Sequence, residues 1–175
     1  AAALLIAARL SNCIVTGNSG GAGIVTLCGS AVAENCLFYN NVPVGSGEGR
    51  ILAASHEGTS HFVNCTFLST GHDFPAVAID ETADGWVVGC ACFAKESSAI
   101  TVRKDRYVSC AGNFDNADSP RWVRTTAAEA FGRDGQWVPC KESPLINAGT
   151  TWAEYLANDG RSRTDLNGNK RRSGD

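Results

Sequence analysis

The sequence predicts an all-β fold: a right-handed parallel β-helix of about five coils, followed by an irregular C-terminal extension. An Asn-Cys dipeptide followed mostly by apolar residues recurs at 12–15, 35–38 and 64–67, and Cys90 and Cys110 continue the series. A repeat of about 20 to 50 residues is typical of a solenoid, in which each repeat buries its apolar face against its neighbours. The intervals between successive cysteines of the series fall at the lower end of this range.

The residues around each cysteine alternate with the period of a β-strand. Apolar or aromatic residues stand three positions before each cysteine, and mostly apolar residues stand two positions after it. Because side chains at i and i+2 of a strand lie on one side, the cysteine and the second residue after it should point inward together. The predicted inward ladder comprises Cys13, Cys36, Cys65, Cys90, Cys110, Val15, Phe38 and Phe67.

A second short strand is expected later in each coil, at 23–26, 51–53, 77–79 and 100–102. Successive coils would then stack as parallel strands about 4.8 Å apart. Because crossovers between parallel strands are nearly always right-handed, we expect a right-handed coil.

The chain divides into 1–112, which we expect to form the coils, and 113–175, an extension that packs on or caps the last coil. The apolar stretch 1–8 is shorter than the roughly 20 residues of a membrane span and lacks the basic residues that open a signal peptide. We interpret it as the last strand of an earlier coil. The solenoid is therefore expected to be N-terminally truncated here, with upstream coils of the same polypeptide as its partner.

Composition excludes one class of partner and leaves the state of the cysteines open. The formal net charge of −3 and the pI near 5.6 give no electrostatic footprint for nucleic acid. Ladder cysteines about 4.8 Å apart are close enough for disulfides. Side chains of in-register parallel strands point the same way, however, and buried cysteine behaves as a small hydrophobe. A reduced ladder is favoured over disulfides, and no cysteine spacing indicates zinc.

One group of residues suggests catalysis. Aligning 77–80 with 100–103 places Asp80 beside Arg103, and Arg50 stands just before the matching strand of an earlier coil. The chemical hypothesis is a partial lyase site, in which a basic residue abstracts a proton. The simpler hypothesis is an exposed ion pair that contributes about 0–1 kcal/mol. We favour the ion pair, because no second carboxylate shares its repeat position.

Histidine, tryptophan and calcium motifs give weaker signals. His56, His61 and His72 sit at different repeat positions, so we expect them to face solvent without converging on a metal. Trp86 and Trp137 lie in strand-like patterns and are expected to pack rather than to stack on sugars. The segment 165–169 resembles the start of a Ca²⁺ loop, but its glycine is misplaced for an EF-hand. We predict no cofactor or metal, with Ca²⁺ as the weaker alternative.

The C-terminal motifs carry a family resemblance. Ser-Pro-Leu-Ile-Asn-Ala-Gly at 143–149, Asp-Leu-Asn-Gly-Asn at 165–169 and the Asn-Cys coils resemble secreted pectin-lyase-like β-helix proteins. The bacterial choice-of-anchor Q proteins are the most similar group. The resemblance implies an extracellular or cell-surface location in a bacterium, and it does not imply one activity.

These observations predict a secreted or cell-surface β-helix module with a structural or adhesive role that faces polysaccharides or cell-surface glycans. A non-catalytic role is favoured, because no complete catalytic site is apparent. The alternative is a polysaccharide lyase or glycoside hydrolase that acts on acidic polysaccharides. No nucleic-acid partner and no membrane span in these residues are expected.

Overall fold

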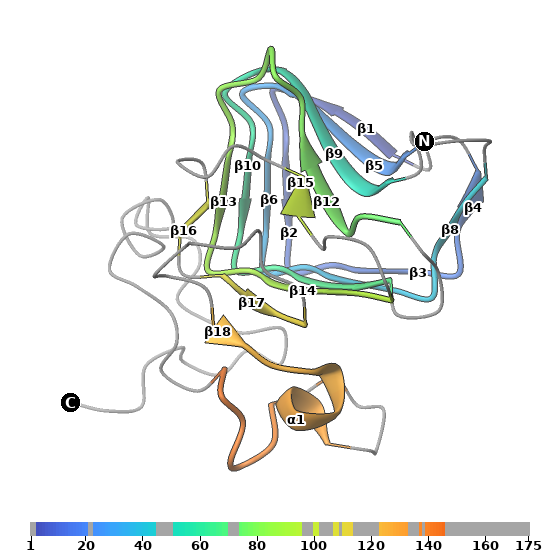
Figure 1. Ribbon diagram of the computed structural model, residues 1–175. Helices are drawn as coiled ribbons and strands as arrows, with labels where there is room; N and C mark the ends of the chain where they lie inside the picture. Colours follow the sequence, from blue (N-terminus) through green and yellow to red (C-terminus); the bar gives the residue numbers. More distant parts are fainter. Residues whose placement is uncertain are drawn as a thin grey trace.

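The computed structural model of the chain describes residues 3–20, 23–44, 51–69, 74–95, 100–101, 107–108, 110–113, 123–132, 137 and 139–145. They form eighteen short strands and one five-residue helix. The strands wind into a three-sided solenoid whose neighbouring strands are all parallel (Figure 1). The predicted all-β parallel solenoid is confirmed.

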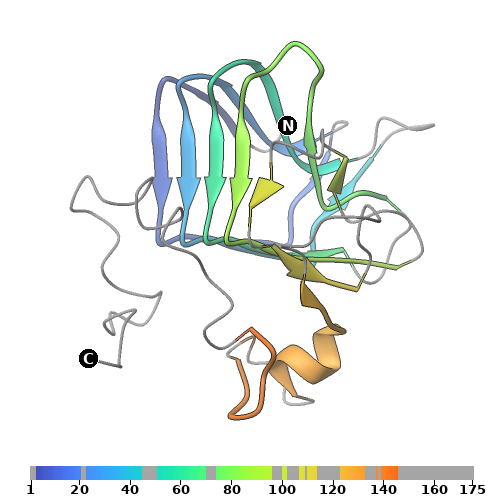
Figure 2. The ribbon, with the colours of Figure 1, turned by 60° about the vertical axis from the view of Figure 1, so that its left-hand side comes forward.

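Each side of the solenoid is one parallel sheet, and each coil visits the sheets in the order B, C, A. Sheet A contains β1 (Ala3–Ile6), β5 (Gly23–Gly29), β9 (Ile51–Gly58), β12 (Val77–Ile79) and β15 (Ile100–Thr101). Sheet B contains β2 (Arg9–Ser11), β6 (Val32–Glu34), β10 (His61–Val63), β13 (Trp86–Val88) and β16 (Tyr107–Val108). Its strands lie side by side in sequence order (Figure 2).

Sheet C contains β3 (Ile14–Thr16), β7 (Leu37–Tyr39), β11 (Thr66–Ser69), β14 (Ala91–Ala94), β17 (Ala111–Gly112) and β18 (Val123–Arg124). A small additional pair joins β4 (Ser19–Gly20) to β8 (Val42–Pro43) between sheets C and A.

The solenoid has about three turns, so the expected number of about five coils was too high. In three turns every side is a strand of at least three residues: β2-β3-β5, β6-β7-β9 and β10-β11-β12. From β15 onward each described strand has only two residues. The interval from Cys90 to Cys110 is the shortest of the cysteine series, so less chain is left for three full sides.

The ladder residues line the interior. Cys36, Cys65, Cys90 and Cys110 are at most 1% exposed, whereas Cys13 in the first coil is half-buried. Among the residues two positions further on, Phe38 and Phe67 are fully buried and Val15 is partly buried. The Phe38 and Phe67 rings stack with centroids 4.6 Å apart, and Phe62 meets Phe67 edge-on at 5.7 Å. Stacked rings of this kind add to the stabilisation from buried apolar area.

The eight cysteines are free thiols, and the ladder thiols donate to backbone carbonyls. Cys65 Sγ, for example, donates to Val63 O in its own coil at 3.4 Å and to Ala33 O in the preceding coil at 3.5 Å. Burial raises the pKa of Cys65, Cys90 and Cys92. A buried thiol held protonated is a poor nucleophile, so these cysteines are structural.

The asparagine before each cysteine forms the corner between sheets B and C. Asn12, Asn35 and Asn64 have φ of 54°, 52° and 52°, and Gly89 takes the same place with φ of 60°. This left-handed region is costly for most residues but is tolerated by asparagine and glycine. The corner geometry therefore explains why asparagine recurs in the repeat and why glycine can replace it.

The described part of the extension packs along the outer side of sheet C. Helix α1 (Ala127–Phe131) begins with a capping box in which Thr126 and Glu129 exchange hydrogen bonds. Phe131 meets Phe93 of β14 at 5.7 Å and Trp137 at 5.9 Å, both edge-on. A second buried apolar cluster thus covers several coils from the side: Leu37, Leu68, Ala91, Phe93, Ala130 and Phe131.

Candidate functional site: the open face of sheet A

The three outer sides of the solenoid differ in exposure. Helix α1 covers part of sheet C, whose first strand keeps Ile14 exposed. On sheet B the outward residues Glu34, Val63 and Val88 are at most 1% exposed, whereas the outward His61 and Trp86 are partly exposed. On sheet A, outward residues alternate with the buried Leu27 and Ser55, and most of those described reach solvent, whereas the outward Ala78 is buried. We use the term open face for the outward residues that are fully or partly exposed: Ile6, Thr26, Cys28, His56, Asp80 and Thr101.

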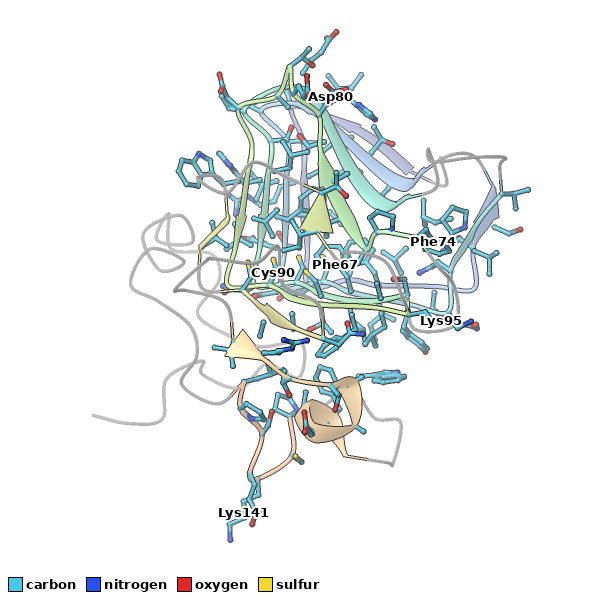
Figure 3. The ribbon with its side chains drawn as sticks, viewed as in Figure 1. Phe67, Phe74, Asp80, Cys90, Lys95 and Lys141 are labelled. Carbon is cyan, nitrogen blue, oxygen red and sulfur yellow. The ribbon has the colours of Figure 1, made fainter. Side chains whose placement is uncertain are left out.

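The register of sheet A brings polar groups from successive coils together. Ser55 of β9 is paired with Ile79 of β12, so the next residues, His56 within β9 and Asp80 just after β12, are neighbours. His56 Nδ1 lies 3.3 Å from Asp80 Oδ2, and both side chains are more than 40% exposed. Figure 3 shows Asp80 at the periphery of the solenoid, whereas Phe67 and Cys90 lie inside.

The carboxylate of Asp80 is held by a turn that follows β12. Its Oδ1 accepts hydrogen bonds from Thr82 N at 3.0 Å and from Thr82 Oγ1 at 3.2 Å. The backbone hydrogen bond from Thr82, with a further contribution from His56, lowers the pKa of Asp80. Hydrogen bonds to the charged form favour ionisation, so the open face carries an oriented, ionised carboxylate at neutral pH.

Only one residue of the hypothesised lyase group can be placed. Arg50 and Arg103 lie outside the described residues, and the described partners of Asp80 are His56 and Thr82. The alignment behind the hypothesis holds where the strands are described, because Val77 pairs with Ile100. The described register ends at the pair of Ala78 and Thr101, and the lyase group itself stays a prediction.

Two of the three predicted histidine positions are described. His56 is exposed, but the sequence analysis did not predict its pairing with Asp80. The insertion at 43–50 lengthens the second coil, so the separation from Cys36 to His56 is greater than the separation from Cys65 to Asp80, and the repeat count does not align the two residues. His61 was expected to face solvent, and this was wrong. It is half-buried on β10, its Nδ1 has no partner among the described residues, and burial lowers its pKa. His72 lies outside the described residues.

A buried ion pair on sheet B was also missed. Arg9 Nη1 lies 2.6 Å from Glu34 Oε2, and Ser11 Oγ donates to Glu34 Oε1 at 2.6 Å. Glu34 is 1% exposed, so the pair satisfies a charge that would otherwise be costly to bury. We assign this cluster a structural role.

Trp86 lies half-buried on β13, paired in register with His61, and Trp137 packs against Phe131 and Tyr39.

Within the described residues, no cluster of three or more His, Cys, Asp or Glu side chains could hold a metal ion. The segment 165–169, which suggested Ca²⁺, lies outside them. None of the described helices is long and apolar enough to span a membrane.

Comparisons with models of protein families, with curated proteins and with solved structures find no match to this chain. The resemblance to choice-of-anchor Q proteins therefore rests on the sequence motifs alone, and the candidate site rests on the geometry of sheet A.

Proposed function

We propose that the protein is a secreted or cell-surface module with a structural or adhesive role, and that the open face of sheet A is its contact surface for glycans. The observation that carries the proposal is the polar character of the open face. Sheet A presents hydroxyl, imidazole and carboxylate groups from successive coils, whereas sheets B and C bury outer residues of several coils and expose others, such as Ile14 of β3. Groups of this kind both donate and accept hydrogen bonds, which suits a polyhydroxylated ligand.

The proposed location outside the cell is supported by the C-terminal motifs, and the buried thiols are compatible with it. The motifs at 143–149 and 165–169 resemble those of exported proteins. Disulfides form readily in oxidising compartments, and four of the eight cysteines, Cys36, Cys65, Cys90 and Cys110, are buried with their thiols bonded to carbonyls. Such thiols are poorly reactive, so the ladder is compatible with an oxidising environment.

A binding role is favoured over a catalytic one by the carboxylate count. Asp80 is the only carboxylate among the residues that define the open face, whereas most glycoside hydrolases need two. The alternative of a lyase on acidic polysaccharides is supported by the register of β12 and β15, in which Val77 pairs with Ile100 as the sequence alignment assumed. In that case Arg103 would supply the base and Asp80 would orient it.

Glycan-array binding tests the proposal. We expect His56→Ala and Asp80→Ala each to weaken binding about fivefold, the effect of losing one hydrogen bond. Lys141→Ala is the matched control, because Lys141 is exposed on the extension, away from Asp80 (Figure 3). Equal binding by all four proteins, or no glycan bound, would overturn the proposal. Release of unsaturated products from polygalacturonate, abolished by Arg103→Ala, would establish the lyase alternative.

A further inference from the structure

One row of the open face brings a thiol, an imidazole and a carboxylate onto neighbouring strands. Cys28 of β5 pairs in register with His56 of β9. On the other side of His56, Asp80 follows β12, and its backbone N donates to Ser55 O at 2.9 Å. The three side chains therefore take the same position in three successive coils, and neighbouring strands of a sheet lie about 4.8 Å apart. All three are fully or partly exposed.

The imidazole of His56 stands between the other two groups and is oriented by one of them. His56 Nδ1 lies 3.3 Å from Asp80 Oδ2. An ionised carboxylate can only accept hydrogen bonds, so a neutral ring in this pair carries its proton on Nδ1. The lone pair of Nε2 is then left to accept a proton. A carboxylate that orients a histidine in this way is the arrangement that activates serine and cysteine nucleophiles.

Cys28 differs from the ladder thiols in exposure and in bonding. Cys36 and Cys65 are buried, and both thiols donate to backbone carbonyls. Cys28 is partly exposed, and its thiol donates to no carbonyl among the described residues. Its side chain can therefore rotate toward the ring of His56, one strand spacing away. Catalytic hydrogen bonds are often long in a ligand-free site and tighten when the substrate binds.

The backbone departs from regular pairing directly beside this row. After the pair of Cys28 and His56, the next pair is Gly29 with Gly58, so Glu57 is an extra residue in β9. Glu57 has φ of 52°, in the left-handed region that is costly for most residues. Bulges of this kind re-aim neighbouring side chains and recur next to active sites. A costly conformation is thus kept at the residue that follows His56.

We propose that Cys28 is a nucleophile for acyl electrophiles, with His56 as its general base and Asp80 as the residue that positions the ring. The sulfur attacks the acyl carbon of an activated ester, a C–S bond forms, and the C–O bond to the leaving group breaks. The thiol proton passes to His56 Nε2, which can return it to the leaving oxygen. The products are a thioester on Cys28 and a free alcohol. This activity goes beyond glycan binding and does not depend on it.

The neighbour of Cys28 on its other side suggests the kind of acyl group. Ile6 of β1 pairs with Cys28 and is 66% exposed. An apolar chain attached to the sulfur could lie against this side chain and bury apolar surface that is otherwise in water. The substrate class is therefore an activated ester with a short apolar acyl chain.

Reaction with p-nitrophenyl butyrate tests the proposal on the chain itself. Brief exposure, followed by mass spectrometry of peptides, gives the rate of butyryl transfer to each cysteine. Cys140 is the internal reference, because it is also partly exposed. We expect Cys28 to react at least about tenfold faster than Cys140, since general bases accelerate such steps by more than this. His56→Ala and Asp80→Asn should each slow Cys28 at least about tenfold and leave Cys140 unchanged.

Two controls separate this role from a general effect of the substitutions. Glu81→Gln removes the same charge from the next residue, which is exposed, and should leave the rate at Cys28 unchanged. The buried Cys65 reports folding in the same experiment, because it should react only where the chain has unfolded. Equal rates at Cys28 and Cys140, or a rate at Cys28 that neither His56→Ala nor Asp80→Asn lowers, would overturn the proposal. Equal losses in Glu81→Gln and Asp80→Asn would overturn the role of Asp80.

Discussion

The side-chain amide of Asn35 donates a hydrogen bond to that of Asn12, 3.1 Å away in the preceding coil, and both residues have φ near +50°. One residue type therefore meets two requirements of the corner between sheets B and C. It tolerates the left-handed backbone, and it can join successive coils through its side chain.

Substitutions at Asn64 separate these two requirements. Asn64 has φ of 52°. We expect Asn64→Gly to change the free energy of unfolding by less than about 0.5 kcal/mol, since glycine adopts this backbone freely. Asn64→Val should cost about 1–3 kcal/mol, because a β-branched residue is strained there. Urea denaturation checks both, and equal losses would contradict the corner geometry.

For two buried serines, replacement by alanine is expected to change the free energy of unfolding in opposite directions. Ser55 Oγ is buried in the interior with no partner among the described residues, whereas Ser69 Oγ donates to Phe93 O at 2.9 Å. Ser55→Ala should leave the free energy of unfolding unchanged or raise it by about 1 kcal/mol, and Ser69→Ala should lower it by about 0.5–1.5 kcal/mol. A larger loss at Ser55 in chemical denaturation would mean that its hydroxyl has a partner.

Stability should fall in mild acid because of His61. Burial lowers its pKa in the folded state, so the unfolded chain binds this proton at a higher pH than the folded protein does. Stability from this group is therefore present above about pH 6.5 and is lost as the pH falls through the folded pKa. His61→Phe should flatten the dependence between about pH 7.5 and 5. The unfolding midpoint at several pH values measures this, and the same slope in His61→Phe as in the unmodified protein would exclude His61.

The interior of the solenoid could be predicted because its constraint is local. Strand alternation places each cysteine and the second residue after it on one side, and the cysteine spacing aligns the coils. Phe38 and Phe67, assigned to adjacent coils on this basis, are paired in register.

The outer surfaces could not be predicted, because they depend on which elements meet in space. Leu68 has the pattern of a solvent-facing residue, yet it is 4% exposed in the cluster that also contains Phe131. Nothing in the repeat indicates that helix 127–131 covers sheet C. The His56–Asp80 pair was likewise hidden, because the insertion in the second coil displaces His56 from the repeat count.

The register of the coils is the central structural claim, and the contrast between Phe67 and Thr66 tests it most directly. Phe67 is fully buried between Phe38 and Cys92, whereas Thr66 points outward and is half-buried. Denaturant unfolding should show a loss of about 3–5 kcal/mol for Phe67→Ala, the range for aromatic truncation in a packed core. Thr66→Ala should stay near about 0.5 kcal/mol. Comparable losses at the two positions would contradict the strand phase and, with it, the stacking of the coils.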